Sequence, residues 1–178
     1  INYDTCHLAV EYEEATEALG VLVQEGIRIS KLHFSSAMKV HPTPEVLAGL
    51  EAYAEDIYFH QVIARTEDGS LRRYRDLPDA LRLASEGGTA ADREWRIHFH
   101  VPLHCAPTER FDTTADQLQK AIQFLGGTPS VCSHVEMETY TWEVLPDEMK
   151  QRDVVDQLVG EYEWTLARLA EQGIAPKK

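Results

Sequence analysis

The feature of this sequence that most restricts its fold is a regular alternation of strand and helix patterns. Four segments predict β-strands, at 1–4, 27–35, 95–103 and 131–140. Apolar residues that recur every three or four positions predict helices at 13–25, 44–54, 76–85, 113–125 and 152–172. Such alternation is typical of parallel strands joined by right-handed crossovers.

A β-hairpin is expected inside the second crossover. Residues 57–65 and 71–75 flank a turn that contains Asp68-Gly69, and Asp-Gly between two alternating runs is a strong hairpin signal. Asp76 follows as the expected N-cap of the next helix. The insertion explains why the interval between the second and third predicted strands is so long.

The number of strand–helix units predicts half of a closed barrel. A (β/α)8 barrel needs about 250 residues, whereas this chain has 178 residues and four such units. We therefore expect an α/β fold in which residues 1–178 form a single partial TIM-barrel domain with a β-hairpin insertion. The chain opens at Ile1, directly before a strand and without Met, so we expect it to be a piece of a longer polypeptide.

Charge and cysteine content exclude several classes of protein. Asp and Glu number 30 against 17 Lys and Arg, which leaves a formal net charge of −13. Such a chain repels phosphate backbones and anionic membranes, so we expect neither as a partner. The three cysteines are far apart and predict neither a disulfide framework nor a thiolate zinc site. With no signal peptide or membrane-spanning run, a cytoplasmic location is expected.

Ionisable side chains share one face of three predicted strands, near the strands' carboxyl ends. Alternate residues of a strand face the same side, which groups the following residues: Lys31, His33 and Ser35; Arg96, His98 and His100; His134, Glu136 and Glu138. Asp4 and His7 stand at the end of the first strand. Active sites of α/β barrels form at this end, so we expect these groups to converge there.

The convergence of carboxylates and imidazoles predicts a cation site. Burying such groups is costly unless a metal or reciprocal hydrogen bonds satisfy them. The mixture suits a divalent ion (Mn²⁺, Mg²⁺, Zn²⁺ or Fe²⁺) in an open catalytic site, and no thiolate is expected to take part. The alternative is a set of buried polar groups satisfied by neighbouring strands and water. The candidate set is Asp4, His7, His33, His98, His100 and Glu138.

These residues resemble the xylose isomerase-like TIM-barrel superfamily, which includes sugar epimerases and endonuclease IV. The resemblance rests on Asp4-x-x-His7, on His33 at the end of the next strand, and on Glu138-Thr139. It implies that Asp4, His33 and Glu138 are metal ligands and that His7 contacts metal or substrate. It also implies that this chain is the C-terminal half, strands 5 to 8, and that the family's fourth-strand Glu ligand has no counterpart here.

A closer resemblance is to the EboE-type metabolite traffic proteins of bacterial ebo clusters, again over their C-terminal half. It spans nearly the whole chain and rests on these motifs: Asp4 to Val10, Ile27 to Lys31, Arg73 to Leu77, His98 to Pro102 and Glu138 to Pro146.

The positions of the candidate residues lead to an expected role for each of them. Glu138 and His7 are the catalytic candidates, and His7, His60, His98 and His100 are the substrate-binding candidates. For His98 and His100, structural packing inside the barrel stays an equal alternative. Glu136 is expected to support a ligand rather than to bind metal itself. Structural roles are expected for His41, His104, His134, Tyr140 and Trp142.

The function expected from these features is a metal-dependent isomerase or epimerase acting on a small polyol or sugar-like metabolite. The alternative is a non-catalytic metabolite-binding or traffic protein that retains the metal pocket. Whether the chain is an enzyme stays open, and the half-barrel alone is expected to be inactive. Its exposed strand edges predict pairing with the missing N-terminal half or with a second copy of the chain. A DNA-repair nuclease is disfavoured because the chain is acidic.

Overall fold

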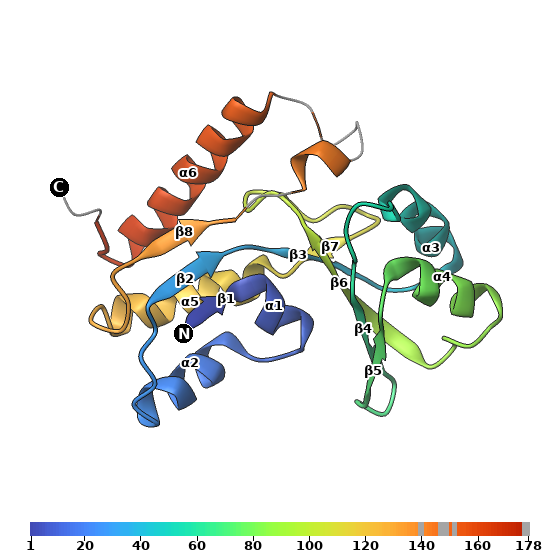
Figure 1. Cartoon of the computed structure of the whole chain (residues 1–178), viewed down its shortest axis with the longest axis horizontal. Coiled ribbons are helices and arrows are strands. Elements are labelled where there is room, and N and C mark those ends of the chain that lie inside the picture. The colour runs from blue at the N-terminus through green and yellow to red at the C-terminus, as the bar shows by residue number, and fades with distance from the viewer. Residues whose placement is uncertain (139–140, 146–149, 151–152, 176–178) are drawn as a thin grey trace.

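The computed structural model describes residues 1–138, 141–145, 150 and 153–175. Within them the strands form two sheets (Figure 1). The first sheet has the order β1-β2-β8 and is parallel, with β1 at Asn2–Asp4, β2 at Lys31–Phe34 and β8 at Val135–Met137. The second sheet has the order β5 (Leu71–Tyr74), β4 (Val62–Thr66), β6 (Asp92–His100), β3 (Ala37–Val40) and β7 (Asp112–Thr113), and its pairings are antiparallel. The fold is therefore mixed α/β.

The second sheet corrects the prediction of four parallel strands. Residues 95–103 were expected to lie among the parallel strands, but β6 (Asp92–His100) pairs antiparallel with β3 and β4. Its neighbour β3 (Ala37–Val40) was not predicted; it follows β2 after only two residues and carries the chain into the second sheet. Within the described residues the parallel sheet has three strands and does not close into a barrel.

The hairpin prediction is confirmed. Strands β4 (Val62–Thr66) and β5 (Leu71–Tyr74) pair antiparallel around a turn in which Gly69 has a φ of 85°. Glycine adopts this left-handed conformation without a steric penalty. The Asp76 side chain accepts a hydrogen bond from the Leu77 amide at the start of α4 (Leu77–Ser85), which confirms the predicted N-cap.

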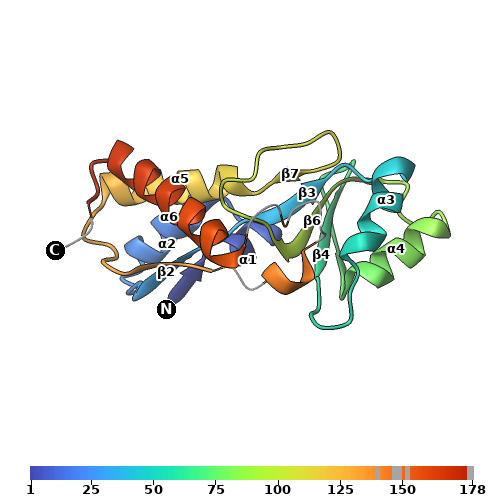
Figure 2. The same cartoon turned by 90° about the horizontal axis from the view of Figure 1, so that it is seen from above.

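The helices gather at two ends of an elongated molecule (Figures 1 and 2). Around the parallel sheet lie α1 (Thr5–Val10), α2 (Ala15–Gln24), α5 (Ala115–Gly127) and α6 (Val154–Glu171). At the other end α3 (Pro44–Leu50) and α4 lie beside the second sheet, which also includes the short β7 (Asp112–Thr113). Short 3-10 helices occur at Glu51–Tyr53 and Trp142–Val144. Among the described residues, none of the helices combines the length and the hydrophobicity that spanning a bilayer requires.

Each sheet buries one apolar face. Leu32 and Phe34 of β2 belong to a core that includes α5 side chains such as Leu118. Ile97 and Phe99 of β6 belong to a second core, on the side of α3 and α4. The polar residues that alternate with them on β2 and β6 are consequently turned the other way, as the two-residue period of a strand requires.

Helix α1 connects the two sheets at these polar faces. It begins directly after β1 and is capped by Asp4, whose carboxylate accepts a hydrogen bond from the His7 amide at 3.0 Å. Its other end is fixed to β6, because the Arg96 guanidinium donates to the Ala9 carbonyl at 2.6 Å. The first turn of α1 therefore lies between the carboxyl ends of the parallel strands and the polar face of β6.

Candidate metal centre

Three of the predicted ligands converge at the carboxyl ends of the parallel strands. Asp4 lies opposite His33 in the register of β1 and β2, and the Glu138 amide donates to the Phe34 carbonyl just beyond β8. His33 Nδ1 lies 3.5 Å from Asp4 Oδ2 and 3.3 Å from Glu138 Oε2. One ligand atom from each residue lies within 4.8 Å of the other two, a spacing that could hold a metal ion.

Hydrogen bonds fix the orientation of the His33 ring. Its Nε2 lies 2.9 Å from Glu136 Oε2, and Asn2 Nδ2 lies 3.2 Å from Nδ1. A carboxylate only accepts, so Nε2–H donates to Glu136, and Nδ1 is the ring nitrogen that faces the carboxylates of Asp4 and Glu138 and would bind a metal ion. Metal-bound histidines commonly donate their other ring nitrogen to a carboxylate in this way.

Glu136 supports this histidine from outside the cluster. Its carboxylate also accepts from Lys31 Nζ and lies 2.8 Å from His134 Nε2. These partners, Lys31 first, lower the pKa of Glu136 to about 2. The supporting role expected for Glu136 agrees with this position, and His134 contacts it as a further structural neighbour.

Asp4 and Glu138 have opposed pKa shifts. Burial raises the pKa of Asp4, but hydrogen bonds from the His7 amide and with Glu138 and Ser35 outweigh it and hold the pKa below its usual value. Burial raises the pKa of Glu138, and the hydrogen bond and charge of Asp4 raise it further. Two carboxylates this close favour sharing either a proton or a cation.

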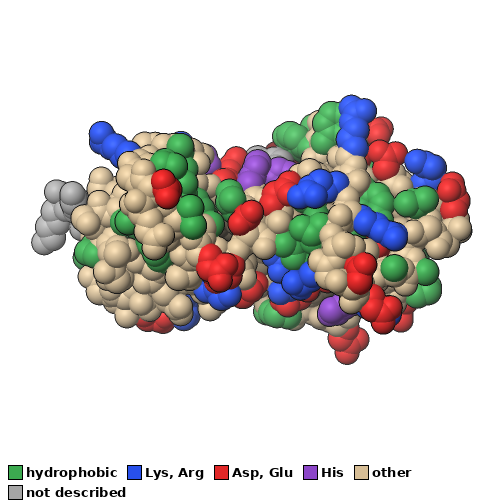
Figure 3. Space-filling view, turned by 90° about the horizontal axis from the view of Figure 1, so that it is seen from below, with side chains coloured by type: hydrophobic (Ala, Val, Ile, Leu, Met, Phe, Trp, Pro, Cys, Tyr) green, Lys and Arg blue, Asp and Glu red, His purple; other side chains and the backbone are tan. Residues whose placement is uncertain are grey.

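A second cluster lies on the polar face of β6, beside the first turn of α1. The His7 ring centroid lies 4.3 Å from that of His98, and the His98 and His100 centroids are 5.2 Å apart. Cys6 is fully buried, and its Sγ lies within 4.8 Å of ligand nitrogens of His98 and His100. Figure 3 shows histidine side chains gathered near the middle of the molecule, between its two ends. The structure thus brings together His7, His98 and His100, as expected.

Burial sets the protonation of this second cluster. It lowers the pKa of His98 to about 3, with the neighbouring His100 and His7 adding to the effect. It also lowers the pKa of His100 to about 4. Burial and the charges of Asp4 and Glu138 raise the pKa of the Cys6 thiol well above its usual value. At neutral pH both imidazoles are therefore uncharged and the thiol is protonated.

Cys6 is the residue that sequence reasoning missed. It was set aside because no Cys-x-x-Cys spacing surrounds it, although it stands between Asp4 and His7. Its position immediately after a strand that carries a candidate ligand could have indicated a role. The direction of the Cys6 side chain depends on the change from strand to helix at Thr5, and that change was not predicted.

His60 is placed differently from the other predicted substrate contacts. Its side chain has no exposed surface, and its ring nitrogens lie 2.9 Å from Glu55 Oε1 and 3.1 Å from the His98 carbonyl. These contacts connect the segment before β4 to β6. Substrate contact by His60 stays a prediction. In the structure its ring contacts Glu55 and the His98 carbonyl, so it helps to fix the segment before β4 against β6.

The remaining predicted structural residues lie outside both clusters. His41 Nδ1 lies 2.8 Å from the Arg93 carbonyl, and Trp142 packs against the core of the second sheet. Tyr140 lies outside the described residues.

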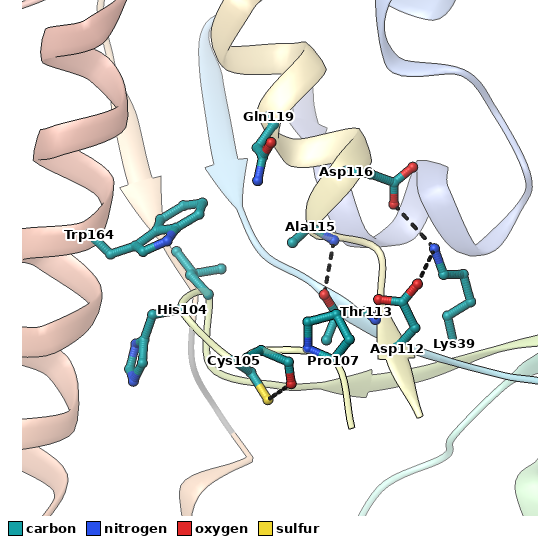
Figure 4. Close-up of a pocket in the computed structure, with 12 residues that line it drawn as sticks. Lys39, His104, Cys105, Pro107, Asp112, Thr113, Ala115, Asp116, Gln119 and Trp164 are labelled. Carbon is teal, nitrogen blue, oxygen red and sulfur yellow. Dashed lines mark hydrogen bonds and ion pairs between the residues drawn. The ribbon is translucent and has the colours of Figure 1, made fainter. Parts of the chain in front are cut away.

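His104 lines a separate cavity of about 360 Å³ between β3, α5 and α6 (Figure 4). Trp164 forms one wall, and Lys39 Nζ lies 3.0 Å from Asp112 and 3.5 Å from Asp116. The lysine charge is thus neutralised within the cavity wall. None of the predicted site residues lines this cavity.

No family model, curated protein or solved structure matches the chain. The function must therefore be inferred from the two clusters. The clusters combine carboxylate, imidazole and thiol groups near the ends of strands, an arrangement that suits metal binding better than nucleophilic catalysis.

Proposed function

We propose that this chain is part of a metal-dependent isomerase or epimerase that acts on a small polyol or sugar-like metabolite. The observation that carries the proposal is the convergence of Asp4, His33 and Glu138 at the carboxyl ends of three parallel strands. Two carboxylates and one imidazole suit Mn²⁺, Mg²⁺, Zn²⁺ or Fe²⁺. Bound between them, the ion would polarise a hydroxyl or carbonyl oxygen of the substrate.

The residues around the ligands suit substrate binding and proton transfer. His7 is exposed beside the cluster, so its ring can contact a substrate and exchange protons with it. Glu138 lies within reach of His33 and Asp4 at the edge of the cluster, and it is the carboxyl group proposed to move the substrate proton. His98 and His100, which lie on β6 beside His7, would contact the substrate as neutral imidazoles.

We further propose that the parallel sheet belongs to a xylose isomerase-like barrel, with the antiparallel sheet as an insertion. Its support is the order of ligands along three parallel strands, each at the carboxyl end. A fourth ligand would then come from another segment, either an N-terminal half of the same protein or a second copy. The three free cysteines are consistent with the cytoplasmic location proposed from the sequence.

A binding or traffic protein is the second candidate. It is favoured because, among the described residues, the candidate cluster that contains Glu138 has three members, and all three are assigned to the metal. Such a protein would hold a metabolite on the metal without converting it.

Metal analysis followed by solvent exchange distinguishes the two candidates. We expect the purified chain to bind one divalent ion at the Asp4 cluster. The chain joined to the segment that supplies the fourth ligand is expected to catalyse the incorporation of deuterium from D₂O next to the carbonyl of a ketose, measured by NMR over a sugar panel. Asp4→Asn should abolish both. Metal binding without exchange would favour the traffic protein, and failure to bind Mn²⁺, Mg²⁺, Zn²⁺ or Fe²⁺ would reject both candidates.

Glu136→Gln is expected to weaken binding at the Asp4 cluster by about 10- to 100-fold without removing a ligand. Glutamine keeps the size of the side chain but loses the charge that orients His33 through its Nε2. The measurement is competition with a chromogenic chelator. Glu86→Gln, on the exposed C-cap of α4, is the matched control and should bind as the wild type does. Equal affinity of Glu136→Gln and wild type would show that Glu136 does not support metal binding by His33.

A further inference from the structure

Cys6, His98 and His100 come from two segments, α1 and β6, which are joined by the Arg96 guanidinium donating to the Ala9 carbonyl at 2.6 Å. The Cys6 amide donates to Ser35 Oγ at 3.0 Å, which fixes the start of α1 to the end of β2. The His98 amide donates to the Gln61 carbonyl at 2.8 Å within the second sheet. Ligand positions that are fixed in this way before binding favour a defined coordination geometry.

The tautomer of His100 is compatible with metal binding. Its Nδ1 lies 3.3 Å from the Glu138 carbonyl, which can only accept, so Nδ1–H is the donor. The Nε2 atom then carries the lone pair, as a metal-binding imidazole requires. The Thr141 hydroxyl donates to the His100 carbonyl at 2.7 Å and holds the backbone at this point.

The donor set differs in chemistry from that of the Asp4 cluster. One sulfur and two imidazole nitrogens favour a softer cation such as Zn²⁺, whereas the two carboxylates and one imidazole favour harder ions. A site with three protein ligands leaves a fourth position open to water or substrate, as in catalytic zinc sites.

We propose that Cys6, His98 and His100 form a second metal site, a thiolate-containing one that takes Zn²⁺, beside the Asp4–His33–Glu138 cluster. On binding, the thiol proton passes to solvent and the sulfur binds the ion as thiolate. The inference goes beyond the proposed function: His98 and His100 become ligands, and His7, which lies against His98, is left at the open side of the site. It does not require the Asp4 cluster to be filled.

Anaerobic titration of the metal-free protein with Co²⁺ tests the thiolate directly. We expect two equivalents to bind and a near-ultraviolet thiolate-to-cobalt charge-transfer band to appear, with Zn²⁺ displacing it. Cys6→Ser should lose the band and one equivalent. His33→Gln, which disables the other cluster, should lose one equivalent and keep the band. Cys105→Ser and Cys132→Ser are matched controls that should keep both.

X-ray absorption of the wild-type protein loaded with two equivalents of Zn²⁺ needs no variant. It therefore tests the site even if the Cys6→Ser variant fails to fold. A zinc–sulfur distance of about 2.3 Å is expected. Absence of sulfur scattering would overturn the proposal. So would a His7→Gln variant that loses the second equivalent while Cys6→Ser keeps it, since that result would assign the site to three imidazoles.

Discussion

Replacement of His33 by alanine is expected to reduce divalent-cation affinity at the Asp4 cluster by more than about 100-fold. Loss of a residue that only orients a ligand costs about 10- to 100-fold, and His33 is itself the ligand between the two carboxylates. Without the ring, Asp4 and Glu138 keep their mutual repulsion but lose the nitrogen that completes the set. The expected order of affinity is wild type, then Glu136→Gln, then His33→Ala.

The measurement is isothermal titration with Mn²⁺, supported by a chelator competition for the tighter complexes. His41→Ala is the matched control, because His41 is an exposed histidine whose Nδ1 contacts a backbone carbonyl far along the chain. It should bind as the wild type does. If His33→Ala retains affinity within a factor of about three of the wild type while Asp4→Asn retains it too, no metal is held by this cluster.

Strand alternation made the Asp4 cluster predictable. Leu32 and Phe34 are apolar and buried, so His33 between them had to face the other side. The same argument applies to Glu136 and Glu138 against Val135 and Met137. Because β1, β2 and β8 are parallel, equivalent ends of these strands meet at one edge. Alternation placed these side chains on one face, but the choice of Asp4, His33 and Glu138 as the ligand set came from the family resemblance.

Strand direction and partners were not predictable in the same way. Residues of β6 alternate between Ile97, Phe99 and the histidines, and this period is identical in parallel and antiparallel strands. Its partners β3 and β4 are selected by contacts between distant residues. The strand β3 was hidden because Ser35-Ser36 precedes it and Pro42 follows, a pattern that resembles a loop.

The same limit applies to Cys6. Its neighbours Asp4 and His7 were selected as site residues by motif, but the direction of Cys6 depends on α1 starting immediately after β1. A change from a two-residue to a 3.6-residue period cannot be located to a single residue in so short a segment. Only the packing of α1 on β6 brings its sulfur to His98 and His100.

The second large effect is on stability in acid: the metal-free protein is expected to lose stability as the pH falls from about 6.5 towards 4. Burial lowers the pKa of His100 to about 4 and that of His98 to about 3, from 6.5. A histidine whose pKa is depressed by folding stabilises the native state fully above its unfolded pKa, and this stability is lost as the pH falls towards the folded value. Each pKa unit corresponds to about 1.4 kcal/mol, so His100 alone accounts for roughly 3 kcal/mol at pH 4.

Neighbouring groups modify this loss without reversing its sign. The lowered pKa of Asp4 adds a loss of stability at still lower pH, whereas the raised pKa of Glu138 acts in the opposite direction between its folded and unfolded values. His98 is partly exposed, so its share is smaller than its shift suggests. The free energy of unfolding, measured by urea denaturation in EDTA at pH 7.5, 5.5 and 4.5, should therefore fall mainly because of His100.

His100→Gln provides the decisive comparison, since glutamine does not titrate and can still donate to the Glu138 carbonyl. This variant should be less stable than wild type at pH 7.5, yet its free energy of unfolding should change less between pH 7.5 and 4.5. His41→Gln, at an exposed histidine, should keep the wild-type slope. Equal slopes for His100→Gln and wild type would mean that His100 is protonated without cost, and that it is not buried among the His98, Cys6 and Glu138 groups as described.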